Sequence, residues 1–148
     1  MTPVPTPAED PNSFILPIRV YYEDTDAAGV VYYANYLRFC ERARTEWLRA
    51  LGFEQQVLMQ DRGIAFVVRT VVADYRLPAR LDDALDVVSQ VVELRGASLV
   101  FAQNILRNKE LIFESRVTVA CLDVRRQRPC ALPEALRNRL QHPNATRT

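Results

Sequence analysis

The chain has 148 residues, of which 49% are hydrophobic, and its formal net charge is +1. This length suits a single domain with its own core, and the hydrophobic share excludes an intrinsically disordered chain. The nearly neutral charge argues against a surface that binds nucleic acid through its phosphates. The one histidine, His142, lies close to the end of the chain. Any enzyme chemistry is therefore expected to run without a histidine base.

The two ends of the chain are polar. Residues 1–13 contain four prolines and no apolar run, so a flexible leader is expected there and not a signal peptide. Residues 141–148 are expected to form a flexible tail. No stretch approaches the roughly 18 apolar residues that span a bilayer. The three cysteines lack metal-ligand spacing and indicate free thiols in a reducing compartment, so a cytoplasmic location is expected.

The first regular elements expected are a strand over residues 14–22 and, after an acidic loop, a long helix over residues 34–51. Asn35 is the expected N-cap of this helix, and Gly52 is its expected C-terminal stop. The apolar residues of the helix recur every three or four positions and form one stripe: Tyr36, Phe39, Cys40, Ala43, Trp47 and Leu51.

Other residues of the helix lie off this stripe. Charged side chains fill the remaining faces, and Arg44 is expected among them on the surface. Leu37 and Leu48 also point away from the stripe. They predict a second covered face and hence an oligomer.

The second half of the chain is predicted to be mostly strand. A connector over residues 53–63 is expected to hold a short helix, and another short helix runs from Pro133 to Leu140. Four strand-like runs lie between them: 64–75, 84–94, 98–106 and 111–124. Together with the first strand they predict an α+β domain over residues 14–140, in which antiparallel strands cover the long helix.

The acidic loop, from Glu23 to Tyr33, is the segment best suited to chemistry. Two carboxylates, Asp24 and Asp26, precede Gly29 and the start of the helix. A helix N-terminus offers unpaired N–H groups and about half a positive charge. Asp26 could act there as a nucleophile, or as a base for water, on a carbonyl whose oxygen is held by N–H groups near Tyr33.

Two other interpretations of the loop stay open. The spacing Asp24-x-Asp26-x-x-Gly29 matches part of a calcium-binding loop, but Ala28 and Asn35 stand where ligands belong. The acids could also be purely structural and favour the helix dipole. Serine-histidine devices, dinucleotide-binding chemistry and kinase chemistry are disfavoured, because the sequence has no G-x-S-x-G, G-x-G-x-x-G or Walker motif.

A long motif adds a family resemblance. The run RVYYEDTDAAGVVYYANY at 19–36, continued by FCERARTEWL at 39–48, resembles the hotdog-fold acyl-CoA thioesterases. The similarity is greatest to the Tol-Pal-associated YbgC family, a relative of 4-hydroxybenzoyl-CoA thioesterase. The resemblance extends from about Phe14 to Leu140 and implies a hotdog fold, with a five-stranded antiparallel sheet wrapped around one long central helix. It also implies a homodimer joined at the sheet edges, or a homotetramer built from two such pairs.

The resemblance further implies hydrolysis of the thioester bond of acyl-CoA, with a short- to medium-chain or aromatic acyl group, to the free acid and CoA. Asp26 would be the catalytic carboxylate and Tyr33 the source of the backbone N–H for the thioester carbonyl. Many YbgC-type sequences have histidine in place of Tyr33, but a backbone N–H survives that change. The implied substrate-binding residues are Gly29, Tyr32, Arg95 and Ser98. The resemblance implies no metal and no separate cofactor, because coenzyme A is part of the substrate.

Members of the family bind coenzyme A or the arm of an acyl carrier protein in a groove at the dimer interface, so a carrier protein is an alternative partner. A dehydratase is disfavoured because that chemistry uses a histidine with an acid. A hotdog protein that binds an acyl carrier or an envelope complex with little hydrolysis stays open. The candidates for the phosphates of coenzyme A are basic residues: Arg95, Arg107, Lys109, Arg125, Arg126 and Arg128.

Overall fold

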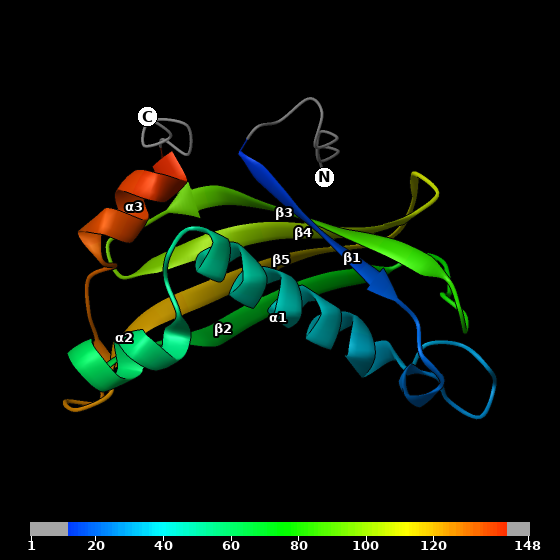
Figure 1. Ribbon diagram of the computed structural model, residues 1–148, viewed down its shortest axis with the longest axis horizontal. Helices are drawn as coiled ribbons and strands as arrows, with labels where there is room; N and C mark the ends of the chain where they lie inside the picture. The colour runs from blue at the N-terminus through cyan, green and yellow to red at the C-terminus, as the bar shows by residue number, and fades with distance from the viewer. Residues whose placement is uncertain (1–11, 142–148) are drawn as a thin grey trace.

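A curled antiparallel sheet wraps around one long helix, α1 (Tyr33–Ala50), in the computed structural model, which describes residues 12–141 (Figure 1). The strand order is β1-β3-β4-β5-β2, and the two-residue β6 pairs with β5. The strand bounds are Ser13–Arg19 for β1, Ile64–Tyr75 for β2, Ala84–Leu94 for β3, Ser98–Arg107 for β4, Glu110–Asp123 for β5 and Arg128–Pro129 for β6. The predicted α+β architecture with five long strands is confirmed.

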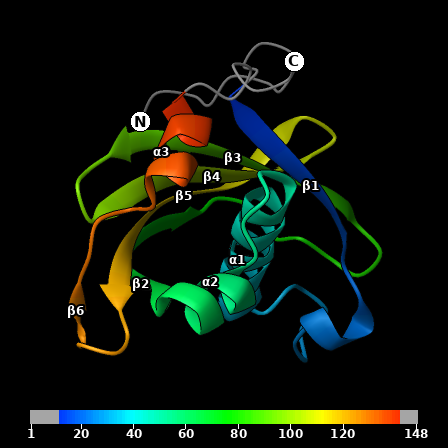
Figure 2. The same ribbon diagram turned by 60° about the vertical axis from the view of Figure 1, so that its left-hand side comes forward.

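Helix α1 packs its apolar stripe against the concave face of the sheet (Figure 2). Tyr36, Phe39 and Cys40 are buried there with Phe113 of β5. Trp47 belongs to a second cluster toward the other end of the helix. Burial of each large side chain contributes about 1.5–3 kcal/mol, before the cost of ordering is counted. The predicted stripe is therefore confirmed as the main attachment of the helix.

The expected N-cap is wrong. Helix α1 begins at Tyr33 with Tyr32 in the N-cap position, and Asn35 is buried inside the first turn. Its side-chain Nδ2 donates a hydrogen bond of 3.0 Å to the carbonyl oxygen of Asp24. Asn35 therefore fixes the preceding loop to the helix and does not cap the helix. The predicted stop is confirmed, because Gly52 follows the end of α1 with a positive φ of 94°.

Two expectations about the other faces of α1 are also wrong. Arg44 is buried, with 9% of its surface exposed, although its position predicted a surface side chain. Leu48 is buried within the protomer, and Leu37 packs against the first core cluster, so neither marks a partner surface. The reason is that the curled sheet covers more of the circumference of the helix than a single stripe requires.

The remaining helices lie at one end of the sheet (Figure 1). Helix α2 spans Gln55–Arg62 and helix α3 spans Glu134–Gln141, close to the predicted short helices. The opposite end holds the acidic loop. Strand β1 ends at Arg19, earlier than predicted, and the loop then starts with a single 3₁₀ turn, η1 (Tyr22–Asp24). The predicted leader and tail lie, apart from their innermost residues, outside the described part of the chain. Within residues 12–141 no helix is long and apolar enough to cross a membrane.

The sheet ends on one side in β2, which has only β5 as a neighbour in the described strands. Its middle carries four exposed apolar side chains: Val67, Val68, Val71 and Val72. The pairing of β2 with β5 shifts register between Val68 and Thr70, which marks a β-bulge around Arg69. A long edge strand with exposed valines is a surface on which another strand can pair.

Candidate active site

The acidic loop closes on itself before α1 begins. The N–H of Asp26 donates to the carbonyl of Val30 at 2.9 Å, and the N–H of Gly29 donates to the carbonyl of Asp26 at 3.0 Å. Gly29 has a φ of 79°, a conformation that L-residues with a side chain rarely adopt. The glycine in the motif is therefore explained by the turn that presents Asp26.

Asp24 is buried and has a structural role. Its carboxylate Oδ2 accepts a hydrogen bond of 2.8 Å from the N–H of Tyr21. Its carbonyl oxygen accepts from the N–H of Tyr32 at 2.9 Å and from the side chain of Asn35 at 3.0 Å. These contacts fix the loop to the first turn of α1.

Asp26 has the opposite environment. It is exposed and borders an open hollow of about 450 Å³ together with Tyr22, Gly29 and Leu81. One of its oxygens, Oδ1, accepts the N–H of Ala28 at 2.9 Å. That bond orients the carboxylate, and Oδ2 has no hydrogen-bond partner among the described residues. The carboxylate is positioned by the loop and is accessible to a substrate or to water.

The start of α1 supplies the donors that the sequence predicted. Tyr33 is the first residue of the helix, so its N–H has no carbonyl partner within the helix, and the rest of the described chain offers it none. The rings of Tyr32 and Tyr33 lie 4.8 Å apart, and Tyr33 also packs against Tyr75 of β2 at 6.3 Å. Both tyrosines are largely exposed. The loop that carries the exposed Asp26 therefore leads directly into a helix terminus whose first N–H is available.

A second loop, residues 76–83, supports the acidic loop from behind. The N–H of Val31 donates to the carbonyl of Ala79 at 2.8 Å, and the N–H of Ala79 donates to the hydroxyl of Tyr36 at 2.9 Å. Burial of the Tyr36 hydroxyl raises its pKa. The hydroxyl is therefore neutral, and it connects α1 to the loop that holds Val31 in place.

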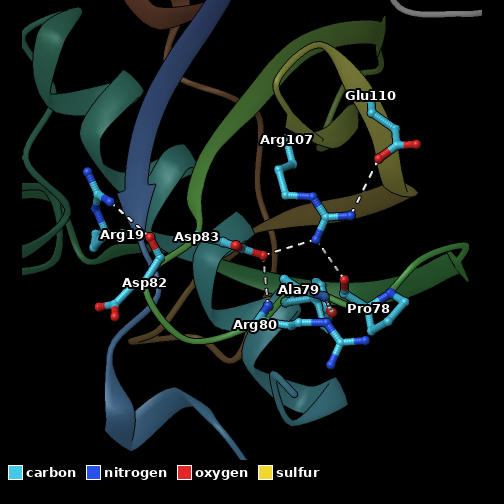
Figure 3. A network of polar contacts seen from close by, with 9 residues as sticks. Arg19, Pro78, Ala79, Arg80, Asp82, Asp83, Arg107 and Glu110 are labelled. Carbon is cyan, nitrogen blue, oxygen red and sulfur yellow. Dashed lines mark hydrogen bonds and ion pairs between the residues drawn. The ribbon is translucent and has the colours of Figure 1, made fainter. Parts of the chain in front are cut away.

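Arg107 holds this supporting loop against the sheet (Figure 3). Its Nη1 donates to the carbonyl of Pro78 at 2.9 Å and to Oδ2 of Asp83 at 3.0 Å, while Nη2 lies 3.4 Å from Glu110. The same carboxylate oxygen of Asp83 accepts the N–H of Arg80 at 2.9 Å. The hydrogen bond to Asp83 raises the pKa of Arg107. This arginine is committed to the loop, which argues against the predicted contact with substrate phosphates.

Comparison with known proteins places this arrangement in a family, because a model of the thioesterase-like superfamily matches residues 20–140. The chain belongs to this superfamily. The acyl-CoA thioesterase YbgC of Haemophilus influenzae is 48% identical over 131 residues, which cover 88% of this chain and 96% of that protein. The acyl-CoA thioester hydrolase YbgC of Escherichia coli is 51% identical over 124 residues, 83% of this chain and 92% of that protein.

Solved structures show the same fold. The 1,4-dihydroxy-2-naphthoyl-CoA thioesterase of Synechocystis matches with a TM-score of 0.82 at 22% identity, and the match covers 87% of this chain and 96% of that one. The predictions of a hotdog fold, of a YbgC-type protein and of a thiolester hydrolase are confirmed by these comparisons.

In this thioesterase the predicted site residues separate into two groups. Asp26 and Gly29 lie in the acidic loop, which leads into Tyr32 and Tyr33 at the start of α1. Arg95 and Ser98 flank the turn between β3 and β4, at the other end of the sheet (Figure 1). A single protomer therefore does not bring Arg95 and Ser98 next to Asp26.

Arg95 and Ser98 are also engaged in contacts within the protomer. Nε of Arg95 donates to Glu93 at 2.9 Å and Nη2 donates to the other carboxylate oxygen at 3.1 Å, which lowers the pKa of Glu93. Ser98 is buried, and its carbonyl accepts the N–H of Arg95 at 2.8 Å. Substrate binding by either residue stays a prediction. The calcium interpretation gains no support, because no group of three or more possible ligands gathers anywhere in residues 12–141.

Sequence reasoning missed a cavity of about 180 Å³ between α1 and the sheet. Arg44 lines the cavity, and its guanidinium donates a hydrogen bond to the side chain of Gln103 of β4. A signal was present, because Gln103 is a polar residue in the middle of the apolar strand Ser98–Arg107. A buried polar residue needs a partner, and the partner here is the arginine of α1. The residues that line the cavity are Glu41, Arg44, Thr45, Leu48, Gln55, Phe66, Val68, Leu99, Phe101, Val119 and Leu136.

Proposed function

We propose that this thioesterase hydrolyses acyl-CoA at the acidic loop, with Asp26 as nucleophile or general base and the backbone N–H of Tyr33 as donor to the oxyanion. The observation that carries the proposal is the exposed carboxylate of Asp26, oriented by its loop, in the segment that leads into a helix terminus with a free N–H. Asp24 is not suited to this role, because the residue is buried and its carboxylate accepts a hydrogen bond from the N–H of Tyr21. The names of the YbgC relatives, which share about half of their residues with this chain, support acyl-CoA as the substrate.

Two routes are open to the Asp26 carboxylate. As a nucleophile it attacks the thioester carbon, CoA leaves as the thiolate, and water hydrolyses the resulting mixed anhydride. As a base it removes a proton from the water that attacks the same carbon. In both routes negative charge develops on the carbonyl oxygen, and a positioned N–H donor lowers the barrier by about 2.7–4 kcal/mol.

The substrate site is completed by a second protomer in this proposal. We infer that two copies pair through the β2 edge, where Val72 is 66% exposed and Val68 is 49% exposed. Antiparallel pairing about a two-fold axis places the C-terminal end of one β2 beside the N-terminal end of the other. Tyr75, at the C-terminal end, packs against Tyr33, whereas Phe66 and Val68, near the N-terminal end, line the cavity. The acidic loop of each protomer then adjoins the cavity of the other.

The pairing is tested by Val72→Asp, which places a charge on the exposed edge. We expect sedimentation analysis to show a dimer for the wild type and a monomer for this variant at micromolar concentration. Val92→Asp is the matched control, because Val92 is also exposed, at 41%, but belongs to the interior strand β3. A dimer that survives Val72→Asp would contradict the β2 interface. Assembly of two dimers into a tetramer stays a prediction.

Hydrolysis itself is tested by release of free thiol from a panel of acyl-CoA esters that covers short, medium and aromatic acyl groups. We expect saturable turnover of at least one of them by the purified chain. The absence of any thiol release above the buffer rate, together with capture of an acyl carrier protein, would favour the binding protein instead. The acyl-carrier partner and the cytoplasmic location stay predictions.

Labelled water tests for the nucleophilic route. In a single turnover in H₂¹⁸O, a nucleophilic Asp26 places the label in its own carboxylate when water attacks the aspartyl carbon of the mixed anhydride. Label in the acid product alone is the result for a general base, and also for a nucleophile whose anhydride is attacked by water at the acyl carbon. Mass spectrometry of the acid and of the peptide that contains Asp26 measures both, and label in the Asp26 peptide establishes the nucleophilic route.

A further inference from the structure

Arg44 is a buried cation with little compensation inside the protomer. Nη1 donates to Oε1 of Gln103 at 2.8 Å, and this is the one hydrogen bond of the guanidinium among the described residues. No carboxylate of the described chain lies within ion-pair distance, and burial lowers the pKa of the guanidinium. A buried charge without a partner is costly, so an arginine in this setting is suited to bind an added oxygen acceptor.

Gln103 fixes where the guanidinium points. The amide Nε2 donates to the carbonyl of Cys40 at 2.9 Å and to the hydroxyl of Ser89 at 2.9 Å. Both donors of the amide are thereby engaged, which leaves Oε1 to face Arg44. All three partners of the amide are buried, so the arginine is held by a rigid polar network beneath α1.

The space in front of Arg44 has the size and the walls of a binding site for a small apolar group. Its volume of about 180 Å³ compares with roughly 150 Å³ for a cavity that holds benzene. Phe66, Leu99 and Phe101 form part of an apolar wall. Besides Arg44, the polar lining consists of side chains from α1 and α2: Glu41, Thr45 and Gln55.

We propose that this cavity receives the far end of the acyl group, and that Arg44 selects acyl groups that end in an oxygen acceptor, either a hydroxyl or a carboxylate. The inference rests on the proposed function, since the acyl group enters the cavity from the acidic loop of the paired protomer. An alkyl end would displace water from the guanidinium and leave its free donors without partners. A terminal oxygen supplies the missing acceptor and lets the rest of the chain pack on the apolar wall.

The experiment measures kcat/KM of the full chain on CoA thioesters matched in length: hexanoyl with adipoyl, octanoyl with suberoyl, and decanoyl with sebacoyl. The ω-hydroxyacyl ester of the best length forms a third arm. We expect a preference of at least 10-fold for an oxygen-terminated ester at one length, with the two kinds of terminal oxygen distinguished by their separate arms. Equal or faster turnover of the plain alkyl esters at every length would overturn the proposal.

The variant Arg44→Met removes the donors and keeps the bulk of an apolar side chain. We expect the preference ratio to fall by about 10-fold, and Arg44→Lys, which keeps one cation, to restore part of it. Arg49→Met is the control, because Arg49 is exposed at the end of α1, and it should leave the ratio unchanged. A ratio that is the same in wild type and in folded Arg44→Met would overturn the proposal. If Arg44→Met does not fold, the wild-type panel alone decides.

Failure of this inference differs from failure of the proposed function. Turnover of alkyl esters that depends on Asp26, without any preference for terminal oxygen, would leave the hydrolase intact and remove the role of Arg44. No turnover of any ester would remove both.

Discussion

Asp24 and Asp26 are two positions apart in one loop, yet the structure gives them opposite environments. Asp24 is buried, and its oxygens accept hydrogen bonds from Tyr21, Tyr32 and Asn35. Asp26 is exposed, and one of its carboxylate oxygens has no partner in residues 12–141. Two identical side chains in the same loop therefore differ in burial and in hydrogen bonding. One fixes the loop to α1, and the other is exposed at the surface of the loop.

The largest expected effect is on turnover by Asp26→Asn. The amide keeps the acceptor for the N–H of Ala28, so the loop and the melting temperature should be unchanged. The loss of the carboxylate should lower kcat by about 10²- to 10⁴-fold, as measured by thiol release. Asp24→Asn is the matched control, because it keeps an acceptor for Tyr21 and should reduce kcat far less. Comparable losses in both variants would contradict the division of roles.

The next effect is on stability and belongs to Asp24. In Asp24→Ala the buried N–H of Tyr21 loses its acceptor, so the free energy of unfolding should fall by about 1–2 kcal/mol. Asp26→Ala, at an exposed position, should change it by less than about 0.5 kcal/mol. Urea denaturation followed by circular dichroism measures both. A larger loss of unfolding free energy for Asp26→Ala than for Asp24→Ala would show that the exposed residue stabilises the loop more than the buried one.

A smaller effect is expected at the turn between the two acids and the helix. In Gly29→Ala the new Cβ has no neighbour within 4 Å, so the cost comes from the φ of 79° alone, about 1 kcal/mol. Gly96→Ala is the control, since its added Cβ also has no neighbour within 4 Å and Gly96 does not have a positive φ. Thermal melts compare the two. Equal stability would mean that the loop relaxes without Gly29.

The smallest effect is expected at Tyr33, whose proposed contribution is a backbone group. Tyr33→Phe and Tyr33→His both keep the N–H at the start of α1, and the side chain is 62% exposed. Each should change the free energy of unfolding by less than about 0.5 kcal/mol and leave kcat within about threefold. Tyr36→Phe is the contrasting variant, because it removes the acceptor for the N–H of Ala79 and should be less stable. A large loss of kcat in Tyr33→Phe would reveal a role for the hydroxyl.

Much of this architecture follows from local sequence patterns. The period of the apolar residues located α1 within one residue at each end, and alternation with turn residues located β2, β3, β4 and β5. The acidic loop and its helix terminus were also found from the sequence, because carboxylates, a glycine and a helix start are neighbours in the chain. Such features depend on interactions between residues a few positions apart, which a pattern records directly.

The tertiary structure decided what no local pattern contains. The burial of Arg44 and Leu48 depends on how far the sheet curls around α1, and that curvature is a property of five strands together. Arg44 meets Gln103 across 59 positions of sequence, and their cavity exists only once helix and sheet are packed. The different environments of Asp24 and Asp26 have the same origin, since the side chain of Asn35 and the N–H of Tyr32 donate to the carbonyl oxygen of Asp24 only after α1 has docked. The sequence thus determined which groups are available, and packing determined which of them are buried and which are exposed.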